Sequence, residues 1–342
     1  ATTALSRLAA AVPLLPGADR LAIVDLDSKL TRVFGRTKAG AKFGHKKVRG
    51  LDFLAATVAT PGHAPVIAAT RLRGGNADTR RNATTFANRA VRSAREAGAT
   101  GTIIVRGDSG FYVGELIAAL TAQGVLFSVT ARQSKGLLRV IAAIDENLWT
   151  PITYDTPVYD EHTGEAIHTA QIAETTHTAF TNPTTNPGQK TTARLIVRRT
   201  RATAITEQGE LFTTWRYHAI FTNSDLGTLA AETQHRARAG AIEHVFADLE
   251  SSALAHFPSA HFHANAAWLT LAALAHNLTR AAGVLAGGEH ARARIPTLRR
   301  QLIAIPARIT HTARTLTLRL PTNWRWQHNY QRLFTATHTR TA

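Results

Sequence analysis

Short apolar runs separated by tight turns dominate the first 130 positions of the chain. Most are rich in β-branched residues and bounded by glycine or polar residues, which predicts strands. The predicted strands are Leu21–Ser28, Leu51–Ala59, Ala64–Arg71, Ile103–Val105 and Leu126–Thr130. Because the early strands follow one another across tight turns, we expect an antiparallel meander that opens a mixed sheet. Residues 82–98 and 111–122 have apolar positions at helical spacing.

The pattern changes at about residue 135. Between 135 and 230 threonine is abundant, prolines appear, and β-patterned runs recur at 193–198 and 215–222. We interpret this stretch as a β-rich region, with a loop at 181–188. After residue 230 the chain has helical character, and the predicted helices span 231–257, 264–286 and 295–310.

Two of the predicted strands carry acids near their ends. Asp25 and Asp27 lie in the first strand, and Asp108 follows the strand Ile103–Val105 within the turn sequence Arg-Gly-Asp-Ser-Gly. Ligands and catalytic groups in open α/β sheets gather at such strand ends. The alternative for Asp108 is a purely structural role as the cap of the following helix.

A third acid lies on a late helix. Ile242, Val245, Phe246 and Leu249 fall at i, i+3, i+4 and i+7, which gives that helix one apolar face. Glu243 lies beside this face, so its carboxylate can project along the edge of a sheet. The alternative is an ordinary solvated helix acid.

The net charge of the chain indicates the kind of partner that it binds. Lys and Arg number 40 against 23 Asp and Glu, a formal charge of +17, which favours a polyanionic partner, most simply nucleic acid. The absence of Cys excludes disulfides and cysteine metal sites. No apolar run is long enough to span a bilayer, and we expect a cytoplasmic, nucleoid-associated protein. The chain also lacks Met, so we interpret residues 1–20 as the end of a missing N-terminal region.

Basic residues are concentrated in a glycine-rich passage after the first strand, in the turn after residue 70, before Glu243 and in the C-terminal segment. From residue 291 onward there are ten Arg and no acid, interleaved with Trp324, Trp326 and Tyr330, a mixture suited to phosphate contact and stacking. The predicted DNA contacts are Arg36, Lys38, Lys46, Lys47, Arg71, Arg73, Arg236, Arg238, Arg299 and Arg300.

Asp27, Asp108 and Glu243 together suggest a metal site. Carboxylates that converge from separate elements suit Mg²⁺, which prefers oxygen ligands. Two such ions, roughly 3.5–4 Å apart, can activate an attacking oxygen and stabilise a leaving one in phosphoryl transfer. A zinc site made by His256, His261 and His263 is a weaker alternative, because Pro258 interrupts the segment and the spacing does not fit one helix face.

Several motifs, in this order, also resemble a known family. They are Asp25-Leu-Asp27-Ser28, the run from Gly35 to His45, Arg71-Leu-Arg-Gly-Gly-Asn76, Val105-Arg-Gly-Asp108-Ser-Gly-Phe-Tyr112, Phe221-Thr-Asn223, Glu243-His-Val-Phe-Ala-Asp-Leu249, Ala264-Asn-Ala-Ala-Trp-Leu269, Ala275-His-Asn-Leu278 and Leu316-Thr-Leu-Arg-Leu-Pro321. As a set they resemble bacterial insertion-sequence transposases of the DDE type, within the integrase superfamily. The most similar group is the transposase DDE domain, group one, and the resemblance covers nearly the whole chain.

The resemblance implies an α/β fold with an RNase-H-like mixed sheet flanked by helices. A β-rich insertion would separate the second and third catalytic acids. The implied divisions are the end of the N-terminal region at 1–20, the first part of the core at 21–134, the insertion at 135–230, the helical part of the core with the catalytic Glu at 231–290, and a basic Arg/aromatic segment at 291–342.

The resemblance also implies a function in transposition of a mobile element. The expected reaction is Mg²⁺-dependent DNA strand cleavage and strand transfer, a recombination of DNA. Asp27, Asp108 and Glu243 would be the catalytic and metal-binding acids, with Asp25 as the fallback for the first and Mn²⁺ as a substitute ion. The implied partners are double-stranded DNA, as terminal inverted repeats and target, and a second subunit in a synaptic dimer; no membrane is expected.

Two positions depart from the family pattern. The family usually has Thr two residues after its first acid, where this chain has Lys29. A basic residue is common one or two turns beyond the family's Glu, where this chain has Glu250. The Arg236-Ala-Arg238 segment lies one residue out of register. These departures support the alternative of a catalytically inactive, DNA-binding transposase remnant.

Overall fold

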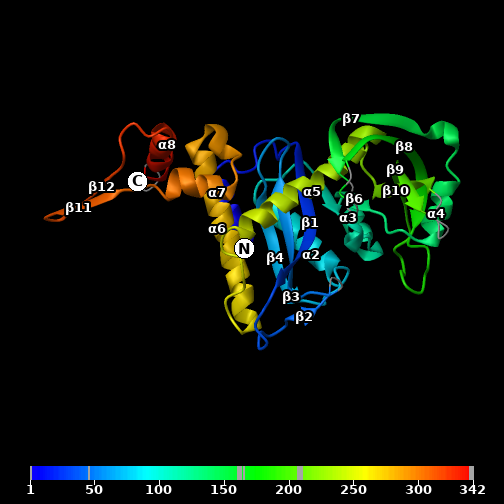
Figure 1. Ribbon diagram of the computed structural model, residues 1–342, viewed down its shortest axis with the longest axis horizontal. Coiled ribbons are helices and arrows are strands. Elements are labelled where there is room, and N and C mark those ends of the chain that lie inside the picture. Colours follow the sequence, from blue (N-terminus) through cyan, green and yellow to red (C-terminus); the bar gives the residue numbers. More distant parts are fainter. Residues whose placement is uncertain (1, 45–46, 160–163, 165, 206–210, 339–342) are drawn as a thin grey trace. The chain divides into compact units, whose positions relative to one another are not determined.

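The computed structural model describes residues 2–44, 47–159, 164, 166–205 and 211–338 (Figure 1). The chain forms two compact units. The first comprises residues 1–77, 89–103 and 240–342, and the second comprises residues 78–88 and 104–239. The chain passes between the units within α2 (Ala83–Glu96), β5 (Thr102–Gly107) and α5 (Thr228–Glu250).

The sheet of the first unit is antiparallel. Strand β3 (Arg49–Ala59) pairs with β1 (Leu21–Arg32), with the short β2 (Lys42–Phe43) and with β4 (Val66–Gly74). This confirms the predicted meander. Strand β1 continues four residues past the predicted end, because its pairing with β3 runs on from Lys29↔Phe53 to Arg32↔Gly50.

Helices cover one face of this sheet. Phe53 of β3 packs edge-on against Phe246 of α5 and Phe257, with ring centroids 5.7 and 6.4 Å apart. The predicted apolar face of α5 is buried in the same core cluster. The remaining helical elements of the unit are α1 (Thr2–Ala11), α6 (Phe262–Ala286), the 3₁₀ turn Gly288–Ala291, α7 (Ile295–Leu298), the π-helical turn Arg299–Ile303 and α8 (Gln327–His338).

Two predicted helices end early. The helix expected over 231–257 ends at Glu250, where the hydroxyls of Ser251 and Ser252 donate to the carbonyl of Asp248 at 2.9 and 2.8 Å and compete with the helical hydrogen bonds. The prediction of a helix over 295–310 is wrong for the second half of that range. Pro306 disfavours helix at the residue before it, and the chain forms the hairpin β11 (Arg308–Thr312) and β12 (Thr315–Arg319).

The second unit contains strand pairs of both directions. Strand β5 runs parallel to β6 (Leu126–Thr130), and the antiparallel order continues from β6 through β10 (Leu211–Thr222), β9 (Thr191–Ile205) and β8 (Ala166–Ala179) to β7 (Thr150–Tyr159). Its other helices are the 3₁₀ turns Ser109–Phe111 and Glu146–Leu148, α3 (Gly114–Ala122) and α4 (Lys135–Ala142).

The fold is therefore mixed α/β with helices flanking the sheet strands, compatible with the expected RNase-H-like class. The stretch from 135 to 230 is rich in β structure, as predicted; its role as an insertion into such a core stays a prediction, as do the division boundaries. Within the described ranges, the helices are all too short or too polar to cross a bilayer.

We expect Asn277→Ala to destabilise the first unit. Asn277 of α6 is buried, and its side chain accepts from the backbone N–H of Ile67 and donates to the Ile67 carbonyl, both at 2.8 Å, so it serves β4 as a substitute strand partner. Its loss leaves two buried backbone groups unsatisfied, a cost of about 2 kcal/mol or more. Denaturant unfolding should show this loss, whereas Leu278→Ala, at the exposed neighbouring position, should change stability little. Equal stabilities would contradict the assignment.

Candidate active site

The first acids lie on the covered face of β1. Asp27 is directly opposite Ala55 of β3, and Ala55 belongs to the core cluster that α5 and α6 bury. Directly paired residues of an antiparallel ladder share a face, as do alternate residues of one strand. Asp25, Asp27 and Lys29 therefore all lie on the face that the helices cover. Asp25 is buried, and one Asp27 carboxylate oxygen accepts the backbone N–H of Ser28 at 2.7 Å.

An ion pair shows which flank of α5 adjoins β1. The Lys29 ammonium lies 3.0 Å from a carboxylate oxygen of Glu250 and 5.9 Å from the centre of the Phe246 ring. Glu243 is seven residues before Glu250, so the two side chains lie on the same flank of the helix, two turns apart. Asp27 and Glu243 are thus on the same side of the first unit, and Glu243 is exposed there.

The same ion pair joins the two residues that depart from the family pattern. Lys29 and Glu250 are the two unusual residues, and they neutralise one another. The Lys29 ammonium is engaged by Glu250, so it carries its own counter-charge beside the Asp27 position.

Asp108 lies in a tight turn of the second unit. Its side chain accepts the backbone N–H of Gly110 at 2.9 Å and caps the 3₁₀ turn that starts at Ser109. Asp108 does not cap the helix α3, as the alternative expected, because the residue before that helix is Val113; the contact to Gly110 occupies only one of several acceptor positions of the carboxylate. Gly107 is required by close approach, because a Cβ there would lie 2.8 Å from the Cβ of Phe111.

An aromatic cluster supports this turn. The Tyr112 ring lies 4.8 Å from Phe180 and 5.9 Å from Phe221, which in turn is 5.5 Å from Phe127. Burial raises the pKa of Tyr112 to about 12, so the phenol stays neutral. Asn223 accepts from the backbone N–H of Phe127 at 2.7 Å and locks the end of β10 to β6. Ring packing beside Tyr112 and this hydrogen bond therefore hold the strands next to the Asp108 turn together.

Arg132 is a candidate that the sequence reading missed. Its guanidinium donates to the carbonyl of Ser109 at 3.2 Å, next to Asp108, and its side chain is exposed. The available signal was topological: Arg132 follows β6 as Asp108 follows β5, and the ends of neighbouring parallel strands lie at one edge of a sheet.

The first part of α5 is fastened to β6 by a buried histidine. The two ring nitrogens of His235 lie 2.9 Å from the Ser128 hydroxyl and 3.0 Å from the Thr130 hydroxyl. Burial, reinforced by nearby Arg238 and Arg106, lowers the pKa of His235 to about 3. The imidazole is therefore neutral at physiological pH.

Comparison with known proteins gives one family. The family model described as transposase DDE domain group 1 matches residues 11–340 of the chain. The chain belongs to this transposase family. No curated protein matches it. Membership supports a transposase function and implies an enzyme of the nuclease or transferase kind that acts on DNA.

The transposase acids are divided between the two units. Asp27 and Glu243 lie in the first unit and Asp108 in the second. In the part of the chain that the structure describes, no three His, Asp or Glu residues form a group able to hold a metal ion, and this includes the three histidines of the zinc alternative. By ligand type alone, the carboxylates of Asp27 and Glu243, with Asp25 as the fallback for the first, suit Mg²⁺, which prefers oxygen ligands. The catalytic role of Asp27, Asp108 and Glu243, and their meeting in one site, remain predictions.

The predicted DNA contacts of the transposase differ in exposure. Five of them are exposed: Arg36, Lys47, Arg71, Arg299 and Arg300. Two are half-buried: Lys38 donates to the Phe257 carbonyl, and Arg236 lies above the Tyr154 ring. Lys46 lies outside the described residues. Arg73 is buried and its Nε donates to Asp52 at 2.7 Å, and Arg238 is also buried. Neither of these two is retained as a DNA contact, because their guanidinium groups are removed from the surface.

Acid should destabilise the transposase through His235. Its pKa is about 3 in the folded state against about 6.5 in an unfolded chain, so the unfolded state binds the extra proton between these values. The free energy of unfolding contributed by this group is present above pH 6.5 and is lost as pH falls toward 3. His235→Gln keeps a donor and an acceptor but cannot titrate, and we expect it to flatten the pH dependence measured by chemical denaturation. The exposed His168→Gln is the control, and an equal effect of both variants would refute this.

Proposed function

We propose that this transposase cleaves DNA at insertion-sequence ends and transfers the strands to target DNA. The single observation that supports this best is the Lys29–Glu250 ion pair, which sets the flank of α5 carrying Glu243 beside the strand face carrying Asp27. Asp108, presented by the turn after β5, is the proposed third acid.

Each acid has a defined role in the proposal. Asp27 and Glu243 would act as ligands from one unit, with buried Asp25 as the fallback, and Asp108 would act from the other. Divalent ions held by these carboxylates, two Mg²⁺ or Mn²⁺, would supply activation of the attacking oxygen and stabilisation of the leaving one. The Glu250 carboxylate keeps the Lys29 ammonium paired, which limits its competition for the Asp27 carboxylate.

The exposed basic side chains would hold the DNA. Arg36, Lys47, Arg71, Arg299 and Arg300 are exposed, and Arg132 adds a cation beside the Asp108 turn. Contacts of this kind bind phosphates irrespective of sequence. The proposed partners are terminal inverted repeats, target DNA and a second copy of the chain that pairs two ends, at the nucleoid in the cytoplasm.

The alternative is an inactive remnant that only binds DNA. Lys29 and Glu250, where the family has Thr and a basic residue, support it. Their mutual neutralisation supports the active enzyme instead, because unrelated decay of two positions would leave unpaired charges. The remnant would bind DNA with a steep salt dependence and cleave nothing in Mg²⁺ or Mn²⁺.

The first test is Asp108→Asn. Asparagine can still accept the Gly110 N–H, so the turn is retained while the negative charge is lost. We expect Mg²⁺-dependent nicking of terminal-repeat DNA to fall at least about a hundredfold, with unchanged DNA binding. Asp145→Asn is the matched control, because Asp145 caps the 3₁₀ turn Glu146–Leu148 with the same 2.9 Å contact and has no proposed catalytic role. Undiminished nicking by Asp108→Asn would remove Asp108 from the mechanism.

A second test compares two acids on one flank of α5. Glu243→Gln should abolish Mg²⁺-dependent nicking, because it removes a proposed ligand. Glu250→Gln, two turns further along, removes only the partner of Lys29 and should reduce activity modestly, with a stability change within about 1 kcal/mol for a partly exposed ion pair. Gel assays of nicking and filter binding of the same duplex separate catalysis from binding. The reverse ranking of the two variants would overturn the assignment of Glu243.

A further inference from the structure

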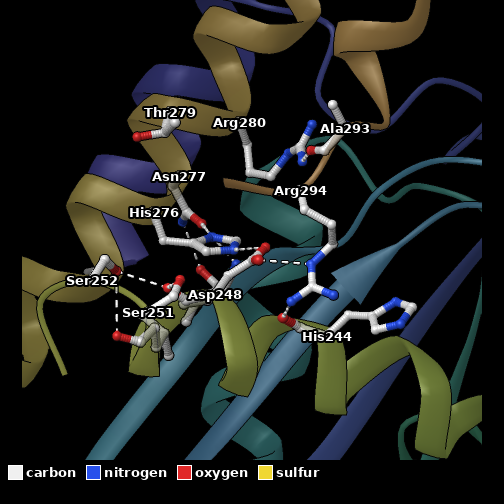
Figure 2. Close-up of polar contacts among 12 residues, drawn as sticks. His244, Asp248, Ser251, Ser252, His276, Asn277, Thr279, Arg280, Ala293 and Arg294 are labelled. Carbon is white, nitrogen blue, oxygen red and sulfur yellow. Dashed lines mark hydrogen bonds and ion pairs between the residues drawn. The ribbon is translucent and has the colours of Figure 1, made fainter. Parts of the chain in front are cut away.

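A basic pocket lies on the other flank of α5, within the first unit. The cavity has a volume of about 260 Å³ and opens between the turn that joins β3 to β4, the α5 flank, α6 and the chain leading into α7. Its polar lining includes Arg292. It also includes the side chains of Arg280, Arg294, His244, His276 and Asp248, which Figure 2 shows. Ala241, His244, Val245 and Asp248 fall at i, i+3, i+4 and i+7, so they form one flank, roughly opposite to Glu243.

Hydrogen bonds from two arginines hold the pocket in shape. Arg294 donates from Nε to an Asp248 carboxylate oxygen at 2.7 Å and from Nη2 to the His244 carbonyl at 3.0 Å. Buried Arg280 donates to the carbonyl of Ala293 (Figure 2) and to those of Ala291 and His290. Arg280 thereby fixes the segment from which Arg292 and Arg294 project.

Charge in the pocket is not balanced. Three guanidinium groups face one carboxylate, and that carboxylate is already engaged by Arg294. In the described part of the chain Arg292 makes no ion pair, and the Nη1 group of Arg294 makes no hydrogen bond. These donors are those that bind phosphate oxygens in other proteins.

A buried histidine also lacks a partner. His276 is 4% exposed, and its Nε2 has no hydrogen-bond partner within the described residues; the nearest Asp248 oxygen is 3.9 Å away, beyond hydrogen-bond distance. Nδ1 of His276 lies 3.3 Å from Asn277 Oδ1, which is an acceptor, so the proton of the neutral ring is on Nδ1. Nε2 can therefore donate to a ligand oxygen only when the imidazole is protonated, a state that burial disfavours and a bound anion favours. Unpaired buried polar atoms are uncommon in native proteins and need a reason.

The volume limits the ligand. Pockets that enclose drug-sized ligands span roughly 300–1,000 Å³, and this one is smaller. It suits one small anionic group better than a whole nucleotide. We propose that the pocket binds a single phosphate group of the DNA backbone. The proposal rests on the proposed function only in taking DNA as the polymer. Because the pocket lies on the flank of α5 opposite Glu243, the bound phosphate would be remote from the cleaved bond.

The test uses Arg292→Ala, because Arg292 is exposed and has no structural partner in the described ranges, whereas truncating Arg294 would leave Asp248 buried without its partner. The affinity of the whole chain for a terminal-repeat duplex is measured against salt concentration. We expect the slope of log K against log salt to become less negative by roughly 0.9, one phosphate contact. Arg92→Ala, an exposed arginine of α2 in the same unit, is the charge-matched control.

A second experiment measures the binding of inorganic phosphate by ³¹P NMR. The phosphate line should broaden with the wild type and less with Arg292→Ala, and Asp248→Asn, which removes the opposing charge, should bind phosphate more tightly. Weaker phosphate binding by Asp248→Asn would overturn an anion site. If Arg292→Ala leaves the salt dependence of DNA binding unchanged, or if Arg92→Ala changes it equally, the ligand is not a phosphate of the DNA backbone, even if free phosphate binds.

The outcomes also separate the two proposals. A wild type that binds no duplex would contradict the proposed function as well. Normal nicking together with an unchanged salt dependence in Arg292→Ala would contradict only the proposed phosphate pocket.

Discussion

The burial of one helical face against the antiparallel strands determines most of what the first unit can do. Ile242, Val245, Phe246 and Leu249 point into the core beside Phe53, and truncating such a phenylalanine typically costs about 3–5 kcal/mol. Since side chains repeat every 3.6 residues around a helix, fixing this face also fixes both flanks. The carboxylate of Glu243 therefore belongs to the β1 side, and Asp248 belongs to the opposite, basic pocket.

Acids are scarce in this chain, and many of them have specific basic partners. Glu250 pairs with Lys29 and Asp248 with Arg294, which joins elements distant in sequence, and Asp52 pairs with Arg73 across the neighbouring strands β3 and β4. With a formal charge of +17, many basic groups remain without such partners. The surplus is the electrostatic basis for binding a polyanion, while the paired groups contribute to the fold.

Several local patterns were read correctly because they depend on neighbours in sequence. The strand Leu126–Thr130, the helix near residues 82–98 and the start of the helix at Ile295 follow their periodicity. Asp108 shows the limit of such reading, since it caps a turn and remains the candidate catalytic acid on that turn. The helix expected beyond Arg299 fails because Pro306 disfavours helix at the residue before it, and the chain forms a π-helical turn followed by a hairpin.

The sequence by itself determined the type of most elements, the surplus of basic charge and, through ordered motifs, the transposase family. Only the tertiary structure decided that Lys29 and Glu250 neutralise one another, that Arg73 and Arg238 are interior, and that Arg292 and Arg294 border a pocket with His276. The physical reason is the separation along the chain between the residues that interact. Periodicity and turn chemistry act between adjacent residues, whereas burial and ion pairing depend on which distant segments the packing of the core brings together.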